Sequence, residues 1–281
     1  NIDFELEPHQ MFVRNFLSSL TPYNGLLLFH GLGTGKTCSS ISVCEDMRQY
    51  YRQLGIKKKI IIVASPVVQE NYKFQLFDKR NLKLSDGIWS INSCTGNRFL
   101  REINPMGIKD LPKKKIITSI NNIIKESYSF MGYIEFANKI NKVIRRGRGT
   151  TQDDSKKKKR KINAIKKEFS DTLLVIDEVH NIRSTIQSKN KKLRRTTQNM
   201  LDLVTYAENM KLLLLTATPM FNNVTEIIWI LNLLNLNDKR FSIKQEDIFD
   251  SNLNFVENPN NENIGKKLLI QKLTGYVSYV S

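Results

Sequence analysis

The sequence has few cysteines and no long hydrophobic run. Its three cysteines, Cys38, Cys44 and Cys94, lack a C-x-x-C spacing. Their odd number argues against a disulfide framework or a zinc site and favours a reducing, intracellular compartment. The apolar runs, such as 25–29 and 212–215, are far shorter than the ~18 residues that a membrane-spanning helix needs. With no secretion signal at the start, we expect no membrane partner.

Acidic residues are also scarce relative to basic ones. The 281 residues include 44 Lys+Arg and 27 Asp+Glu, which gives a net charge of +17. This balance favours a polyanionic partner, nucleic acid before membrane, although a basic surface without such a partner is the plainer interpretation. The hydrophobic content of 40% supports a sizeable core and excludes disorder of the whole chain.

Short apolar segments alternate with helical patterns along the chain. Strands are predicted at 25–29, 59–64, 115–118, 173–176 and 211–216, and helices at 12–20, 36–54, 67–77 and 224–234. This alternation predicts an α/β fold in which helices cover both faces of a parallel sheet. Ligands of such sheets bind beyond the carboxyl ends of the strands.

One basic segment interrupts this pattern. Residues 145–168 contain eleven Lys or Arg and three Asp or Glu. We predict a solvated insertion, flexible or a polar helix, between two strands. Either it contacts nucleic-acid phosphates or it is a surface loop without a partner; a nuclear-localisation role is a weaker alternative.

The strongest motif is His30–Thr37, which reads H-G-L-G-T-G-K-T between a predicted strand and a helix. Its glycines allow backbone N–H groups to face phosphate oxygens in a P-loop. Lys36 would reach the β- and γ-phosphates, and the Thr37 hydroxyl would bind Mg²⁺. The strict P-loop pattern has Gly where this chain has His30.

A second motif, Leu173–Asn181, has four apolar residues followed by Asp177 and Glu178. Asp177 would hold Mg²⁺ through its water shell, and Glu178 would orient or deprotonate the attacking water. The alternative is a buried strand capped by two acids. After another strand, Thr216 and Thr218 would link the nucleotide site to a moving neighbour, although Pro219 is also typical of an ordinary turn.

Gln10 precedes the P-loop strand. Its amide can pair with adenine N6 and N7 at the same time, which would select ATP. Alone, a glutamine at this place is usually a solvated polar residue.

In combination, these segments resemble superfamily 2 helicases and translocases. Gln10 is similar to the Q motif, 33–37 to motif I, the D-E-V-H of 177–180 to motif II and 216–218 to motif III. Ala64–Pro66 resembles motif Ia, and 118–119 with 132–133 resembles motif Ib.

A narrower resemblance, to helicases of large nucleocytoplasmic DNA viruses, rests on 25–40, 217–222, 231–234 and 275–279. That group, which includes the poxvirus early transcription factor small subunit and nucleoside triphosphatase I, also has His at the position of His30.

The resemblance implies one RecA-like lobe over 1–237, with the basic insertion at about 145–168, and a helical linker over 238–281 towards a second lobe. It implies an ATP-dependent helicase or translocase that uses ATP and Mg²⁺. The resemblance implies catalytic roles for Lys36, Asp177 and Glu178, and Mg²⁺ binding by Thr37 and Asp177. It implies that the nucleotide is bound by Gln10, Gly31, Gly33, Thr34, Gly35, Lys36, Thr37 and Cys38, and that nucleotide state is coupled to motion by His180, Thr216 and Thr218. The residues implied to contact nucleic acid are Pro66, Thr118, Lys156, Lys157, Lys158, Lys159, Arg160 and Lys161.

The implied partner is DNA, with RNA as the alternative, together with viral transcription or nuclease machinery in a virion or a cytoplasmic viral factory. Other interpretations are a nucleic-acid-binding scaffold with a non-hydrolysing ATP switch, and a P-loop kinase. The Asp177–Glu178 pair disfavours the scaffold, and its combination with 216–218 disfavours the kinase. Stimulation of ATP turnover by nucleic acid would separate these classes.

Overall fold

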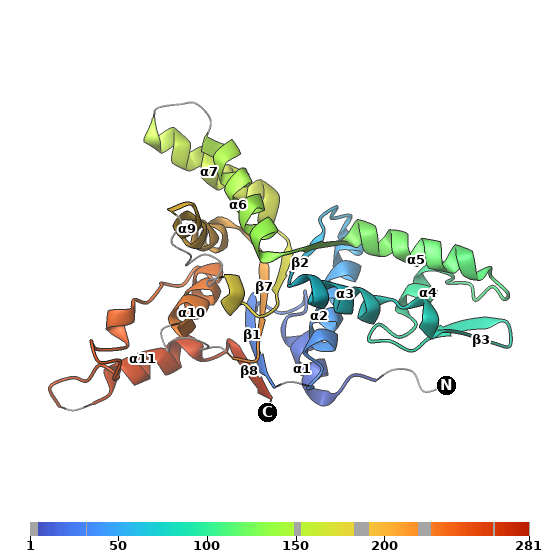
Figure 1. Cartoon of the computed structure of the whole chain (residues 1–281), viewed down its shortest axis with the longest axis horizontal. Coiled ribbons are helices and arrows are strands. Elements are labelled where there is room, and N and C mark those ends of the chain that lie inside the picture. Colours follow the sequence, from blue (N-terminus) through green and yellow to red (C-terminus); the bar gives the residue numbers. More distant parts are fainter. Residues whose placement is uncertain are drawn as a thin grey trace.

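A single parallel sheet forms the centre of the molecule (Figure 1). The structure, a computed structural model, describes residues 5–31, 33–148, 153–182, 191–218, 226–260 and 262–280. In this part of the chain, six parallel strands follow the order β5-β2-β6-β7-β1-β8. They are β1 (Gly25–His30), β2 (Ile60–Val63), β5 (Tyr128–Met131), β6 (Leu173–Ile176), β7 (Lys211–Thr216) and β8 (Val277–Val280).

Helices cover both faces of this sheet (Figure 1). On one side lie α1 (Pro8–Phe16), α2 (Lys36–Leu54), α3 (Pro66–Leu76), α4 (Arg98–Ile103) and α5 (Lys113–Ser127). On the other side lie α6 (Tyr133–Arg148), α7 (Asp154–Phe169), α9 (Lys191–Tyr206), α10 (Glu226–Asn237) and α11 (Ile264–Leu273). Two short 3₁₀ turns, Lys79–Asn81 and Gln245–Asp247, and an antiparallel hairpin of β3 (Leu82–Ser85) and β4 (Ile88–Ile91) complete the described elements.

In the central strands, alternate residues enter two separate cores. In β1, Leu26 and Leu28 pack with α1–α5, whereas Leu27 packs with the helices on the opposite face. Side chains of a strand point to opposite faces in turn, so a strand covered on both sides must be apolar throughout. This is why the chain has continuous runs such as Leu212–Leu215, all fully buried.

The prediction of a parallel α/β sheet with helices on both faces is confirmed. The helix predicted at 36–54 and the strands predicted at 173–176 and 211–216 have the observed bounds. The start predicted for the helix at 224–234 lies outside the described residues, and α10 is described from Glu226.

The strand predicted at 115–118 is wrong, because these residues belong to α5. Its buried residues Ile116 and Ile120 are four apart, which is the spacing of one helix face, and Pro112 directly precedes the helix. The strand of this region is β5, which pairs with β2 at the edge of the sheet.

The segment expected to be a helical linker contributes to the sheet itself. Residues 264–273 form α11, but β8 follows and pairs with β1 from Leu27↔Val277 to His30↔Val280. Residue 237 therefore does not mark the end of the sheet. The alternation of exposed and half-buried residues in β8 fits an edge strand, which the sequence pattern did not reveal.

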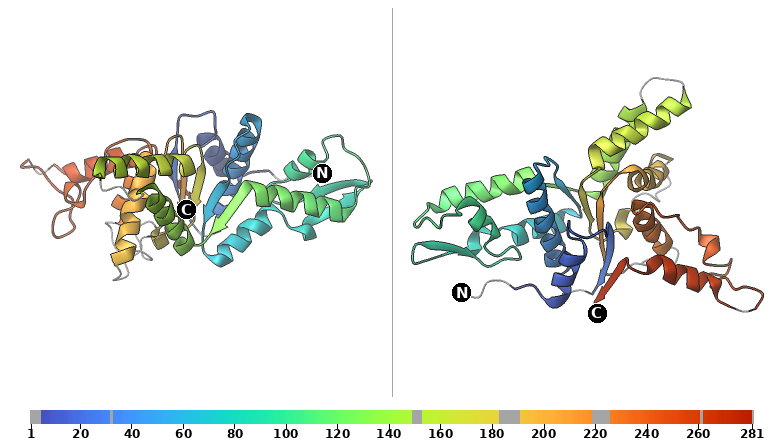
Figure 2. Two further views of the ribbon diagram at one scale, coloured as in Figure 1. Left: turned by 90° about the horizontal axis from the view of Figure 1, so that it is seen from above. Right: turned by 180° about the vertical axis from the view of Figure 1, so that it is seen from behind.

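The basic segment belongs to a helical hairpin, α6–α7: residues 145–148 end α6, and most of the rest lies in α7. Asp153 caps α7 by accepting hydrogen bonds from the backbone N–H groups of Ser155 and Lys156; the predicted segment also includes 149–152, which lie outside the described residues. α6 starts after the carboxyl end of β5, and α7 ends before the amino end of β6. The end of α6 and the start of α7 therefore project beyond the amino edge of the sheet (Figures 1 and 2).

The structure pairs two of the three cysteines, which the argument against a disulfide framework did not anticipate. Cys38 of α2 and Cys94, 56 residues apart, form a disulfide with a Cα–Cα distance of 5.4 Å. Cys44 is free and buried. Among the described residues, no helix has the length and apolarity required to cross a membrane.

Candidate nucleotide site

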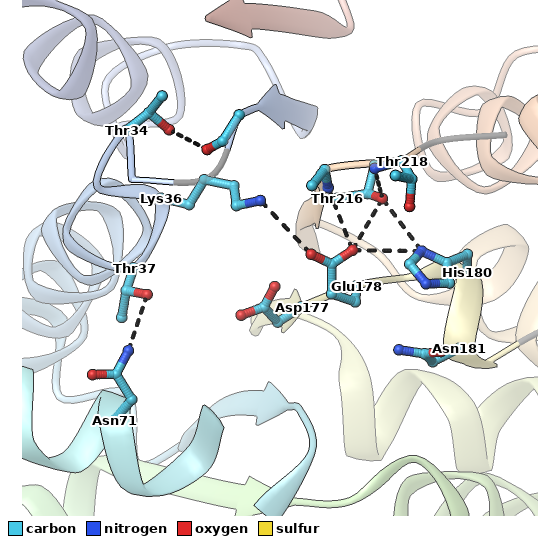
Figure 3. Close-up of polar contacts among 12 residues, drawn as sticks. Thr34, Lys36, Thr37, Asn71, Asp177, Glu178, His180, Asn181, Thr216 and Thr218 are labelled. Carbon is cyan, nitrogen blue, oxygen red and sulfur yellow. Dashed lines mark hydrogen bonds and ion pairs between the residues drawn. The ribbon is translucent and has the colours of Figure 1, made fainter. Parts of the chain in front are cut away.

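The predicted catalytic residues meet at the carboxyl edge of the sheet (Figure 3). β7 lies between β1 and β6, so the segments that follow these three strands converge. Lys36 begins the helix after β1, Asp177 and Glu178 follow β6, and Thr216 ends β7. Strand order, not closeness in sequence, brings these groups together.

The loop after β1 turns through two glycines in the left-handed region, Gly33 with φ 84° and Gly35 with φ 76°. The positive φ favours glycine at position 35, and a Cβ atom there would lie 2.4 Å from Nε2 of Gln10, so the end of that side chain would have to move. The Thr34 hydroxyl donates to the carbonyl of Gly31 at 2.8 Å, and the Thr34 carbonyl is hydrogen-bonded to His9 Nε2 at 2.9 Å.

The Gln10 amide makes contacts within the chain, and its pairing with adenine stays a prediction. Its side chain is buried. Its Nε2 donates to the Gly35 carbonyl at 3.4 Å, and its Oε1 accepts from the Glu7 N–H at 3.1 Å. Both ends of the amide therefore stabilise the loop and the start of α1.

His30 has a structural reason to replace the glycine of the strict pattern. Its ring is completely buried, and its Nε2 is hydrogen-bonded to the hydroxyl of Ser278 on β8 at 2.9 Å. The next N–H, of Gly31, donates to the Val280 carbonyl at 2.8 Å. Burial, with His9 and Lys36 nearby, lowers the pKa of His30 to about 4. The edge strand β8 thus anchors the beginning of the P-loop.

Lys36 and Glu178 face each other across the site (Figure 3). The Lys36 ammonium lies 3.7 Å from Glu178 Oε1, and its side chain is 13% exposed. Within the described residues the Nζ atom has no hydrogen-bond partner. An ammonium with three unused donors in a buried position is suited to an anionic ligand.

Asp177 is a buried carboxylate next to a second one. Burial and the charge of Glu178 raise its pKa to about 6, against the opposing effect of Lys36. Two adjacent carboxylates are stabilised by a cation. Thr37 of α2 points into the same site, and its hydroxyl accepts a hydrogen bond from Asn71 Nδ2 at 3.5 Å. No cluster of three or more metal-ligating side chains occurs in the described part of the chain.

The carboxylate of Glu178 is held by β7. Its Oε2 accepts from the Thr216 hydroxyl at 3.1 Å and from the Ala217 N–H at 3.3 Å. His180 Nδ1 lies 3.5 Å from the same oxygen and 3.3 Å from the Thr216 hydroxyl. Thr218 joins the cluster through its N–H, which donates to Thr216 Oγ1 at 3.0 Å. Glu178 itself has φ 44°, which is uncommon for a non-glycine residue and typical of functional sites.

The residues predicted to bind nucleic acid are not brought together. Pro66 is exposed at the carboxyl edge, where it starts α3 after β2. Thr118 is exposed on α5, not after a strand as predicted. Residues 156–161 lie on α7, in the hairpin that projects beyond the opposite edge.

Three polar residues of the site, Asn71, Tyr133 and Asn181, have no individual role predicted from the sequence, although Tyr133 lies in the stretch that resembles motif Ib. Asn181 directly follows the D-E-V-H motif, which was a usable signal, whereas the contact of Asn71 depends on how α3 packs. Cys38 is bonded to Cys94, and its contact with the nucleotide stays a prediction.

Comparison with known proteins agrees with this geometry. The model of the SNF2-related domain matches residues 9–275. A solved structure titled as the Sulfolobus solfataricus SWI2/SNF2 ATPase core in complex with dsDNA superposes with a TM-score of 0.51 and 16% identity, covering 99% of this chain and 45% of that one. At this identity the likeness supports the RecA-like fold alone.

Viral proteins are similar over most of the chain. A protein of Acanthamoeba polyphaga mimivirus named as an ATP-dependent RNA helicase is 26% identical over 99% of this chain and 23% of its own length. One of Frog virus 3 (isolate Goorha), named as a helicase, is 28% identical over 97% of this chain and 23% of its own. The nucleoside triphosphatase I of Heliothis armigera entomopoxvirus is 25% identical over 92% of this chain and 31% of its own length.

This chain therefore spans between about a fifth and a third of the length of these relatives. The match of the family model over 9–275, nearly the whole chain, is decisive for its classification: the chain belongs to the SNF2-related domain family.

Proposed function

We propose that this chain is the ATP-binding lobe of a nucleic-acid-dependent ATPase of the superfamily 2 helicase and translocase type. The observation that carries the proposal is the convergence of Lys36, Asp177, Glu178 and Thr216 at one edge of the sheet (Figure 3). An ammonium, two carboxylates and a hydroxyl provide the groups needed to bind Mg·ATP and to activate water.

The residues fit ATP with Mg²⁺. Lys36 has unused donors for phosphate oxygens, and the backbone of the glycine-rich loop leads into the N-terminus of α2. Thr37 and Asp177 would hold Mg²⁺, which neutralises the phosphate charge during transfer. Since Mg²⁺ usually keeps several waters and phosphate oxygens as ligands, two protein ligands are sufficient.

Glu178 is the group best suited to orient the attacking water and accept its proton. Thr216 and the Ala217 N–H hold one of its oxygens, while the other faces Lys36. A phosphate that binds to Lys36 competes for that ammonium, which frees the second oxygen of Glu178 for water. A change in the position of this carboxylate would then be transmitted to a neighbouring lobe through Thr216, Thr218 and His180.

A cavity of about 500 Å³ lies between α1, α2 and α4, and we propose that it accepts the base and ribose. Met11 and Arg14 line it from α1, Ser42 and Glu45 from α2, and Arg98 from α4. Its mixed polar and apolar lining is typical of small-molecule sites. In this arrangement Gln10 acts indirectly, through the loop that it stabilises.

Nucleic acid is the proposed partner at two separate surfaces. The first is the carboxyl edge near Pro66. The second is the α6–α7 hairpin, where Lys158, Lys159 and Arg160 are exposed and no described acidic residue forms an ion pair with them. We favour DNA contacted through its backbone, with RNA as the alternative, since similar proteins carry names that refer to either.

The hairpin surface can be tested by the salt dependence of binding to a 20-base-pair duplex. Replacing Lys158, Lys159 and Arg160 by Ala should lower the salt slope by up to about 2.7, because each phosphate contact contributes about 0.9. The matched control replaces three exposed lysines elsewhere, Lys244, Lys266 and Lys267. Equal slopes in the two variants would remove the hairpin from the proposal.

A second RecA-like lobe, supplied by a longer protein or another molecule, would complete the site. An arginine from such a lobe accelerates hydrolysis by about 10³–10⁵, so this chain alone should bind Mg·ATP weakly and hydrolyse it slowly. We further propose that the complete motor acts in viral transcription or genome processing, with transcription or nuclease machinery, in a virion or viral factory.

Glu178→Gln tests the catalytic assignment. In single-turnover measurements with excess protein, this variant should retain Mg·ATP affinity within about threefold and lose about 10²-fold or more in hydrolysis, the usual contribution of a general base. Hydrolysis equal to that of the parent would mean that Glu178 does not activate water.

A further inference from the structure

A disulfide ties the start of the P-loop helix to a segment that is distant in the sequence. Cys38 is the third residue of α2 and directly follows Thr37; it is bonded to Cys94, which lies between β4 and α4. Cys94 and the next four residues, 95–98, line the cavity proposed for the base and ribose, and α2 lines the same cavity. The bond therefore joins two walls of the proposed nucleotide site, beside the residues that would hold the phosphates and Mg²⁺.

Other contacts keep the segment 94–98 and α4 in place without the disulfide. The Thr95 hydroxyl donates to the carbonyl of Leu76, at the end of α3, at 3.0 Å. Arg48 of α2 forms an ion pair with Glu102 of α4 at 2.9 Å, roughly 15 Å further along the helix than the disulfide at a rise of about 1.5 Å per residue. Loss of the disulfide would therefore release the start of α2 from this segment while the fold is retained.

The surroundings of the disulfide fit both the oxidised and the reduced pair. Cys38 is only half-buried, and both cysteines line a second cavity of about 330 Å³, which gives a small reductant a route to the sulfurs. Gln75 lines that cavity too, and its Oε1 lies 3.1 Å from Cys94 Sγ and 3.9 Å from Cys38 Sγ. This oxygen is placed to accept the hydrogens of the two thiols that reduction creates.

We propose that the Cys38–Cys94 bond is a reversible redox clamp that regulates nucleotide binding: the disulfide form binds Mg·ATP more tightly than the dithiol form does. The groups of the site have their assembled geometry while the bond is intact. In a reducing compartment, which the cysteine usage favours, protein disulfides are usually transient and often redox-sensing. The inference rests on the proposed function and adds the regulation of that same site.

The co-reactant of the clamp is a dithiol. One of its thiolates attacks one sulfur of the protein disulfide, whose S–S bond breaks as a mixed disulfide forms. The second thiol of the reagent then displaces the protein sulfur and closes a disulfide within the reagent. Two electrons and two hydrogens thus pass from the dithiol to Cys38 and Cys94, and exchange with an oxidised dithiol runs the same steps in reverse.

The test measures the affinity of the chain for Mg·ATPγS after treatment with oxidised or reduced dithiothreitol, and counts the free thiols in each form. The oxidised chain should have one free thiol, that of Cys44, and bind at least about fivefold more tightly than the reduced chain, the lower end of typical couplings. Linkage requires the same factor in reverse. Saturating Mg·ATPγS should therefore lower the reduction potential of the bond by about 20 mV or more, since a tenfold change corresponds to about 30 mV; a bond that only stabilises the fold would show no such shift.

Two variants locate the effect in this pair of cysteines. Cys94→Ser cannot form the bond and leaves α2 unchanged, so it should bind Mg·ATPγS as the reduced parent does after either treatment. The control, Cys44→Ala, changes the cysteine outside the pair and should keep the response of the parent. Far-UV circular dichroism of the reduced parent should equal that of the oxidised form.

The outcomes distinguish the clamp from the proposed function. Equal affinity of the two forms of the parent, three free thiols in the oxidised chain, or a response that persists in Cys94→Ser would overturn the clamp alone. A reduced parent that has lost its helical signal would assign weaker binding to unfolding and would also overturn it. Failure of both forms to bind Mg·ATPγS would overturn the proposed function and, with it, this regulation.

Discussion

His30→Ala offers a test of how the edge strand supports the P-loop. The substitution removes a completely buried ring and its hydrogen bond to Ser278. Loss of the bond contributes about 1 kcal/mol, and loss of the buried ring about 2 kcal/mol more. At about pH 7.5 the free energy of unfolding should therefore fall by about 3 kcal/mol.

The difference in the free energy of unfolding between the parent and His30→Ala should become smaller in acid. The pKa of His30 is lowered from 6.5 to about 4 in the folded chain, so the unfolded chain binds a proton first as the pH falls. The stability that neutral His30 provides is complete above pH 6.5 and declines as the pH falls towards 4. At about pH 5 the parent has lost about 2 kcal/mol of this stability. The difference in the free energy of unfolding between parent and variant is then about 1 kcal/mol.

Urea unfolding of both proteins at the two pH values measures this gap. Ser278→Ala serves as the control, since it keeps the ring and should cost about 1 kcal/mol. A gap between parent and His30→Ala that is equal at both pH values would refute the account of His30 as a buried neutral ring.

Three further predictions concern the site and its support. Lys36→Ala should weaken Mg·ATP binding about 10²-fold or more in an equilibrium titration, since it removes charge-assisted hydrogen bonds of about 1.5–3 kcal/mol each. The control variant Lys73→Ala, which changes an exposed lysine, should bind Mg·ATP as the parent does. Normal affinity in Lys36→Ala would reject the P-loop assignment. Glu45→Ala should lower the free energy of unfolding by about 3–5 kcal/mol, because buried Arg48 and Tyr128 both donate to that carboxylate; a loss below about 1 kcal/mol in urea would contradict this. Removing Mg²⁺ with EDTA should lower ATP affinity in the same titration, and unchanged affinity would argue against the metal assignment.

The central strands could be predicted from sequence because burial on both faces requires continuous apolar runs. The segments 173–176 and 211–216 carry this pattern, and the helix at 36–54 follows a glycine-rich loop that fixes its start. The edge strands β5 and β8 could not be found in this way, since each has a neighbour on one side only and mixes polar with apolar residues. The isoleucine-rich segment of α5 also matches a strand pattern, because a short apolar run is compatible with either structure.

In the site, motifs identified the residues that follow strands, such as Lys36, Glu178 and Thr216. They did not predict contacts that depend on distant segments. The pairing of His30 with Ser278 spans 248 positions, and the bond from Tyr133 to Asp177 spans 44. The motif likewise gave no sign that the Gln10 amide contacts the carbonyl of Gly35.

Steady-state ATP hydrolysis by the 281-residue chain, measured with and without single- and double-stranded DNA, tests the central claim most directly. The account predicts detectable Mg·ATP binding with turnover near zero in every condition, because the proposed second lobe would supply the remaining catalytic groups. Strong turnover stimulated by DNA would keep the motor class but contradict the claim that this chain is an incomplete site.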